Sequence, residues 1–132
     1  MRLVLDTNVL IAAFISHGVC NELLEHCILN HEIILSKFIL TELKDKLTGK
    51  FKFTAREANA AVRLLKSRCE VVTISLLDSP ICRDPDDDSI IATAIAGECA
   101  CIITGDKDLL DLNSACGVQI IPPDFFWQFE QT

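Results

Sequence analysis

The 132-residue sequence has no long apolar run, no export signal and no phosphate-binding glycine loop. No hydrophobic stretch reaches the roughly 20 residues that a membrane helix needs, so we expect no membrane partner. The first acid, Asp6, comes too early for a secretory signal, and we expect a cytoplasmic protein. Neither G-x-x-x-x-G-K-[ST] nor G-x-G-x-x-G occurs, and no serine, histidine or cysteine is arranged as a nucleophile. A catalytic site would therefore have to be built from other residue types.

Paired cysteines and spaced histidines are also missing. The seven cysteines form no C-x-x-C pair, their number is odd, and most lie within apolar runs, where a free thiol packs as a small hydrophobic side chain. We therefore expect reduced cysteines rather than disulfides or a zinc site. His17, His26 and His31 lack the spacing of metal ligands and are expected at the surface or partly buried.

Basic residues are scarce and unevenly placed. Twelve lysines and arginines face nineteen acids, and the net charge of −7 is awkward for a nucleic-acid-binding protein. However, residues 37–68 hold nine bases and three acids, a net charge of +6, and the remainder of the chain is at −13. A basic lobe beside an acidic centre suits a phosphate backbone held on one side and metal ions on the other. Solvated lysine faces on two helices explain the pattern equally well.

Apolar runs alternate with helical patterns along the chain, which predicts an α/β fold with a mainly parallel sheet in a single domain spanning residues 1–132. Strands are predicted at residues 3–5, 33–35, 71–73, 101–103 and 118–120. Helices are predicted at residues 9–15, 21–29, 88–96 and 107–113, and after two N-caps, Ser36 and Thr54. Glu57 stands three residues after Thr54, as in a capping box.

Two of the predicted strands end in an acid. Asp6 follows the first strand, and Asp106 follows Thr104-Gly105 after the strand at 101–103. In open α/β sheets, ligands bind at this carboxyl edge. A charge there is costly to desolvate, no lysine or arginine close in sequence offers to pair with it, and a divalent ion would. The alternative role for either aspartate is to cap the following helix, which Asn8 could do in place of Asp6 without a charge.

Further candidate acids lie in and beyond the run Asp84-Pro85-Asp86-Asp87-Asp88. Crowded carboxylates are unfavourable without cations. Asp88 is in line with the apolar positions three, four and seven residues later and is the predicted ligand, with Asp87 as the alternative because the helix is apolar nearly all round. Asp108 could be a supplementary acid at the rim or a first-turn helix acid. Oxygen ligands of this kind suit Mg²⁺ or Mn²⁺, which promote phosphodiester hydrolysis.

Four segments in this order together resemble the PIN-domain family, and within it the single-domain toxins of toxin–antitoxin systems (VapC-like nucleases). The segments are Asp6-Thr7-Asn8-Val9-Leu10, Ser36 with Glu42-Leu43, Asp84 to Asp88, and Thr104-Gly105-Asp106-Lys107-Asp108-Leu109-Leu110. The resemblance extends from Arg2 to about Pro122. Glu42 would be read as a surface glutamate by itself, and it becomes a candidate only by association with the other acids.

The resemblance implies a three-layer α/β/α sandwich with a mainly parallel central sheet and an acidic pocket at the strand ends. It implies a metal-dependent endoribonuclease that uses Mg²⁺ or Mn²⁺ on an RNA substrate, is neutralised by an antitoxin protein, and forms a possible homodimer. Carried onto this sequence, the catalytic, metal-binding acids are Asp6, Glu42, Asp88 and Asp106. Secondary positions are Asn8, Thr104, Asp87 and Asp108.

Two other functions stay open at this point. A strand-end aspartate with a later Gly-Asp also resembles phosphatases of the haloacid-dehalogenase type, although their second acid would stand where this chain has Asn8. A non-catalytic, partner-binding α/β domain is the other alternative. Its contact surface would be the aromatic segment near the end of the chain, unless these rings pack into the core. The rings are Phe125, Phe126, Trp127 and Phe129.

Overall fold

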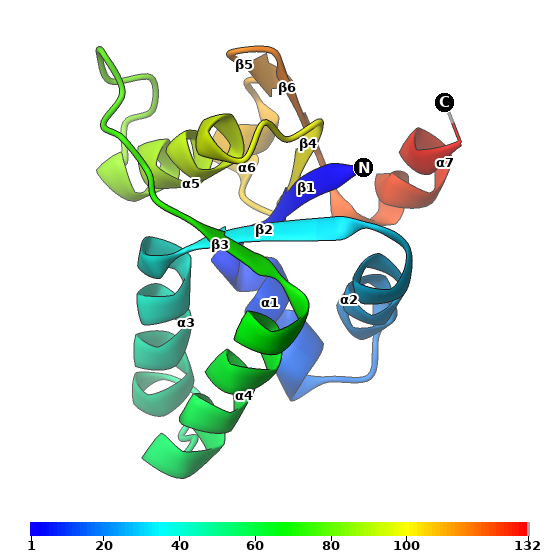
Figure 1. Ribbon diagram of the computed structural model, residues 1–132, viewed down its shortest axis with the longest axis vertical. Helices are drawn as coiled ribbons and strands as arrows, with labels where there is room; N and C mark the ends of the chain where they lie inside the picture. Colours follow the sequence, from blue (N-terminus) through cyan, green and yellow to red (C-terminus); the bar gives the residue numbers. More distant parts are fainter. Residues whose placement is uncertain (132) are drawn as a thin grey trace.

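The computed structural model describes residues 1–131, and a sheet runs through the middle of the molecule (Figure 1). Its strands are β1 (Arg2–Leu5), β2 (Glu32–Ser36), β3 (Glu70–Val72), β4 (Cys101–Ile103), β5 (Ser114–Ala115) and β6 (Val118–Ile121). Their order is β3-β2-β1-β4-β6-β5, and every neighbouring pair is parallel except β5 with β6. The five predicted strands are confirmed. The two-residue β5 was missed because it carries no apolar run.

Helices cover both faces of the sheet. They are α1 (Thr7–Ile15), α2 (Val19–Asn30), α3 (Lys37–Gly49), α4 (Ala55–Arg68), α5 (Pro85–Ala96), α6 (Lys107–Leu110) and α7 (Phe126–Glu130), with a 3₁₀ turn at Pro123–Phe125. Figure 1 shows α1 to α4 on one face and α5 on the opposite face. The predicted three-layer α/β/α sandwich with a mainly parallel sheet is therefore confirmed.

Local hydrogen bonds explain where two of these helices begin. The Ser36 hydroxyl accepts from the Ile39 backbone N–H and caps α3. At the start of α4, the Thr54 hydroxyl accepts from the Glu57 N–H (3.1 Å), and the Glu57 carboxylate accepts from the Thr54 N–H (2.9 Å). Both predicted caps are therefore confirmed. Such caps form because the first N–H groups of a helix have no hydrogen-bond partner within the helix.

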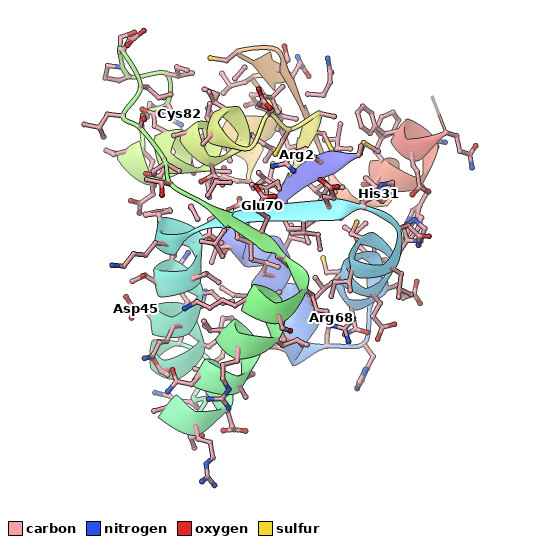
Figure 2. The ribbon with its side chains drawn as sticks, viewed as in Figure 1. Arg2, His31, Asp45, Arg68, Glu70 and Cys82 are labelled. Atoms are coloured by element: carbon pink, nitrogen blue, oxygen red, sulfur yellow. The ribbon has the colours of Figure 1, made fainter. Side chains whose placement is uncertain are left out.

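The sheet has two chemically different edges. At the amino edge, the Arg2 guanidinium donates to Glu32 (2.8 Å) and Glu70 (2.9 Å), which ties together the first residues of β1, β2 and β3 (Figure 2). At the carboxyl edge, the chain runs from β1 outward through β2 to β3 and then returns to place β4 on the other side of β1. Such a reversal of strand order opens a crevice beyond the strand ends. Asp6 and Asp106 follow the two strands that border it.

No single helix within residues 1–131 is long and apolar enough to cross a membrane; by length and composition alone α1 and α2 would pass together, with a bend of 107° between them. The seven cysteines are all free thiols, as predicted.

Candidate active site

Asp6 and Thr104 face each other at the ends of the two central strands. Leu5 pairs with Ile103 in the parallel register of β1 and β4, so the next residue of each strand reaches the same edge. The buried Thr104 hydroxyl donates to Asp6 Oδ2 (2.7 Å) and accepts from the Asp106 backbone N–H (3.0 Å). Thr104 thus positions Asp6 and connects it to the segment that carries Asp106.

Both strand-end aspartates are also helix caps. Asp6 Oδ1 accepts from the Thr7 N–H (2.6 Å) at the start of α1, and Asp106 Oδ1 accepts from the Asp108 N–H (2.8 Å) at the start of α6. Asp84 caps α5 in the same way through the Asp86 N–H (2.9 Å). The alternative role of these aspartates as helix caps is therefore present in the structure. It does not exclude metal binding, because a carboxylate has enough lone pairs to accept the capping hydrogen bond and bind a cation at the same time.

Asp87, and not Asp88, faces this cluster. Asp87 is 8% exposed, and the positions three, four and seven residues after it are buried. The Asp88 carboxylate instead accepts from the backbone N–H groups of Ile81 (3.3 Å) and Cys82 (2.8 Å) and holds the preceding loop. The prediction that Asp88 points into the site is wrong, because α5 begins at Pro85 and its buried stripe includes Asp87, whereas Ile95, in line with Asp88, is 41% exposed.

One polar cavity of about 90 Å³ brings these groups together. Its lining residues are Asp6, Asn8, Glu42, Lys46, Asp84, Asp86, Asp87, Ile90 and Asp106. Glu42 and Lys46 come from α3, with Lys46 Nζ 3.9 Å from a Glu42 oxygen. Six carboxylates therefore share this small space with a single lysine.

Burial, together with the crowding of carboxylates, raises the pKa of the two buried aspartates, Asp6 and Asp87. Burial is the largest cause for Asp87, followed by repulsion from Asp106, and its pKa rises to about 7. Burial also raises the pKa of Asp6, against the opposing hydrogen bonds from Thr104 and Thr7. A divalent cation would remove the repulsion, and an all-oxygen ligand set suits magnesium or manganese. The residues present therefore fit a metal centre of that class.

Asp108 lies at the rim of the cluster. Its carboxylate accepts from the exposed Arg83 guanidinium (2.9 Å) and does not line the cavity. Even so, carboxylate oxygens of Asp87, Asp106 and Asp108 lie within 4.8 Å of one another. The ion pair with Arg83 is largely exposed and therefore weak, so Asp108 is free to turn inward.

The structure thus assembles Asp6, Glu42 and Asp106 with Asn8 and replaces Asp88 by Asp87. Sequence reasoning missed the places of Asp84 and Lys46 in the cavity wall. A usable signal was present for α5, because proline is favoured at the first helical position and an aspartate directly before it is a good cap. Reading Asp84-Pro85 as a helix start shifts the helix by three residues and directs attention to Asp87.

Comparisons with known proteins give a family-model match, a sequence relative and several similar structures. The family model described as a PIN domain matches residues 2–108. An uncharacterized protein of Methanocaldococcus jannaschii is 35% identical over 122 residues, covering 86% of this chain and 76% of that protein. Similar structures include VapBC2 from Rickettsia felis bound to a fragment of promoter DNA (TM-score 0.68, 19% identity, 92% of this chain and 98% of that one). Another is the sarcin–ricin-loop-cleaving toxin VapC20 of Mycobacterium tuberculosis (TM-score 0.59, 17% identity, 89% and 98%). At these identities the structural likeness establishes the fold.

Proposed function

This chain belongs to the PIN-domain family, and from that membership we propose that it is a metal-dependent endoribonuclease, the toxin of a toxin–antitoxin pair. The observation that carries the proposal is the convergence of Asp6, Asp87 and Asp106, from three distant parts of the sequence, on one small cavity. The mycobacterial structure named as a sarcin–ricin-loop-cleaving toxin supports an RNA substrate. The VapBC2 structure supports a protein antitoxin as partner, and a homodimer is part of the same proposal.

In this proposal, Asp6, Asp87 and Asp106 hold Mg²⁺ or Mn²⁺, and Asp87 takes the role first assigned to Asp88. A divalent ion bound there would neutralise charge on the scissile phosphate and lower the pKa of a water molecule. Thr104 keeps Asp6 in its orientation through the 2.7 Å hydrogen bond. Thr104 is thus a positioning residue rather than a ligand.

Glu42 and Lys46 supply the opposite wall of the site. Glu42 is partly exposed beside the aspartates, where it can orient a water molecule and accept its proton. Lys46, one helical turn further along α3, can attract a phosphate oxygen into a cavity that is otherwise strongly negative. Without such a cation, the crowded carboxylates would repel the RNA.

A path for the RNA backbone lies next to α3. A cavity of about 590 Å³ between α3 and α4 has three lysines in its lining, Lys37, Lys44 and Lys66, against one acid, Asp45. These lysines belong to the segment 37–68 with its net charge of +6. Their arrangement in one groove favours phosphate binding over the alternative of separately solvated side chains.

The two other functions have less support. The phosphatase alternative lacks its second acid, because Asn8 stands at that position. For the partner-binding alternative, the aromatic segment is mostly packed: Phe126 is fully buried and Trp127 is partly buried against the core, whereas Phe125 is 44% exposed. The comparisons support neither alternative.

The test is RNA cleavage by chelator-treated protein to which Mg²⁺ or Mn²⁺ is added back, with a pool of structured and unstructured RNAs. We expect cleavage only with the ion and a loss of at least about 100-fold in Asp6→Asn, since metal stabilisation of a transition state amounts to several kcal/mol. Asp124→Asn is the matched control, because Asp124 is an exposed acid in the 3₁₀ turn after β6 and lines neither the acidic cavity nor the groove between α3 and α4. Equal cleavage by Asp6→Asn and the parent protein would refute the proposal.

A further inference from the structure

Three side chains outside the acidic site converge on one point. His26 lies on α2, His31 follows the end of α2, and Glu130 is the last residue of α7. Nε2 of His26 and Nε2 of His31 are each 2.5 Å from the same oxygen, Glu130 Oε2. Figure 2 shows His31 where α2 passes into β2, beside the C-terminal helix. The convergence is tertiary, since about 100 residues separate Glu130 from the two histidines.

The two contacts are shorter than ordinary N–H···O hydrogen bonds, which measure about 2.7–3.2 Å. One carboxylate oxygen thus receives both imidazole nitrogens, so the three potential ligand atoms already face a single point. The hydrogen bonds from both histidines hold the pKa of Glu130 below its usual range, so the carboxylate is ionised at neutral pH. With neutral imidazoles, the three side chains have a net charge of −1, which attracts a dication.

We propose that His26, His31 and Glu130 form a binding site for a zinc-type transition-metal ion, separate from the acidic site. Two imidazoles with one carboxylate suit zinc, whereas the acidic site offers oxygen ligands alone. The three ligand atoms already lie within 4.8 Å of one another. A tetrahedral zinc ion with bonds of about 2.1 Å needs its ligand atoms about 3.4 Å apart. The Glu130 carboxylate must therefore retreat by about 1 Å, a small movement for a side chain on a short helix.

The surroundings suit an ion that is bound but still reachable. The side chains of His26, His31 and Glu130 are 29%, 11% and 24% exposed. The His26 ring lies 4.8 Å from the Trp127 ring, and the His31 ring lies 5.6 Å from that of the buried Phe126. This aromatic wall lowers the local polarity and strengthens the attraction between the carboxylate and a cation. The fourth coordination position would be filled by water from the open side.

The neighbours of the Nδ1 atoms determine which nitrogen of each imidazole carries the proton. A metal ion bound at Nε2 would displace that proton. The Met1 ammonium donates to His31 Nδ1 (3.0 Å), and the Asn30 amide lies 3.3 Å from His26 Nδ1, so each ring carries its proton on Nε2. When the ion binds, these protons move to Nδ1. Rotation of the Asn30 amide would provide an acceptor for the proton on His26 Nδ1, and the Met1 amino group would have to turn away from His31 Nδ1.

The consequence would be a metal-dependent attachment of α7 to α2. Glu130 is the contact through which α7 reaches these histidines, and the ion would replace the two hydrogen bonds by three coordinate bonds, one to each side chain. This inference does not depend on the nuclease proposal, because none of its residues lines the acidic cavity.

The experiment titrates Zn²⁺ and Co²⁺ into metal-free protein of the full chain. Calorimetry counts bound ions, the visible absorption of Co²⁺ reports nitrogen ligation, and Tm reports stabilisation. The double variant Asp6→Asn with Asp106→Asn serves as background, so that the acidic site does not contribute. We expect one equivalent of Zn²⁺ and a rise in Tm in that background, and an increase in Kd of at least tenfold with His26→Gln, His31→Gln or Glu130→Gln.

His17→Gln is the matched control, since His17 is exposed and lies outside the cluster. Circular dichroism verifies the fold of each variant, and Glu130→Gln, near the chain end, serves where a histidine variant fails to fold. If Zn²⁺ fails to bind to the background protein, or if the cluster variants bind it as tightly as His17→Gln does, the proposal is overturned. The three residues would then form only a hydrogen-bonded contact.

Discussion

Asp87 is the carboxylate whose ionisation should most oppose folding when no cation is present. Its pKa rises from 3.8 to about 7, with burial as the main cause and Asp106 as the next. Because the folded-state pKa exceeds the unfolded one, the folded protein holds the proton more tightly. The resulting stabilisation is complete below about pH 4 and is lost as the pH rises to about 7. The difference of about three between the folded-state and unfolded-state pKa of Asp87 corresponds to about 4 kcal/mol in the free energy of unfolding. This value is an upper limit, because neighbouring acids share the effect.

Replacing this residue by its neutral isostere should remove the penalty. In chelator at pH 8, we expect Asp87→Asn to raise the free energy of unfolding by about 2–4 kcal/mol relative to the parent protein. At pH 4 the difference should nearly vanish, because the parent carboxyl is then protonated in the folded state. Urea unfolding at pH 4, 6 and 8 measures both values. In the RNA assay, the same variant should lose at least about 100-fold of its cleavage rate.

Asp88→Asn is the neighbouring comparison. It weakens the hydrogen bonds to the Ile81 and Cys82 N–H groups and should lower stability by about 1 kcal/mol while leaving cleavage within a few-fold of the parent. If Asp87→Asn were no more stabilising at pH 8 than at pH 4, the argument from burial and repulsion would fail. If Asp88→Asn lost cleavage and Asp87→Asn kept it, the assignment of Asp87 to the site would be refuted.

Three further outcomes are expected. Thr104→Val leaves Asp6 without its buried hydrogen-bond donor and should lower the free energy of unfolding by about 1–3 kcal/mol in urea. Thr104→Ser keeps a hydroxyl and should be nearly as stable as the parent; if both variants were equally stable, Thr104 would not stabilise Asp6. Gly97→Ala places a Cβ 2.5 Å from Ile34 Cγ2 and should cost about 1–3 kcal/mol by calorimetry, whereas an unchanged Tm would show that the strand and helix separate easily there. Mg²⁺ or Mn²⁺ at 100 times Kd should stabilise the parent by about 2.7 kcal/mol and Asp6→Asn much less, and equal stabilisation of both would place the ion elsewhere.

Much of the fold follows from local patterns. The strand at 33–35 is a short apolar run between Glu32 and Ser36, and the strand at 101–103 is an apolar run that ends at Thr104; they are found as β2 and β4. The caps at Ser36 and Thr54 involve residues three positions apart, so their hydrogen bonds can be read from neighbouring letters. Asp6 and Asp106 could also be placed, because a strand that ends in an acid delivers it to the sheet edge wherever the strand lies.

Contacts between distant segments could not be read in this way. Periodicity alone did not separate Asp87 from Asp88, because α5 is apolar nearly all round and only its packing against β1, β2 and β4 selects the buried side. The cluster of His26, His31 and Glu130 depends on where α7 settles after the last strand. The sequence by itself thus determined the strands, the caps and the acids at the strand ends, since these arise from interactions between near neighbours. Only the tertiary structure decided which side chains meet, because that choice depends on how whole helices pack.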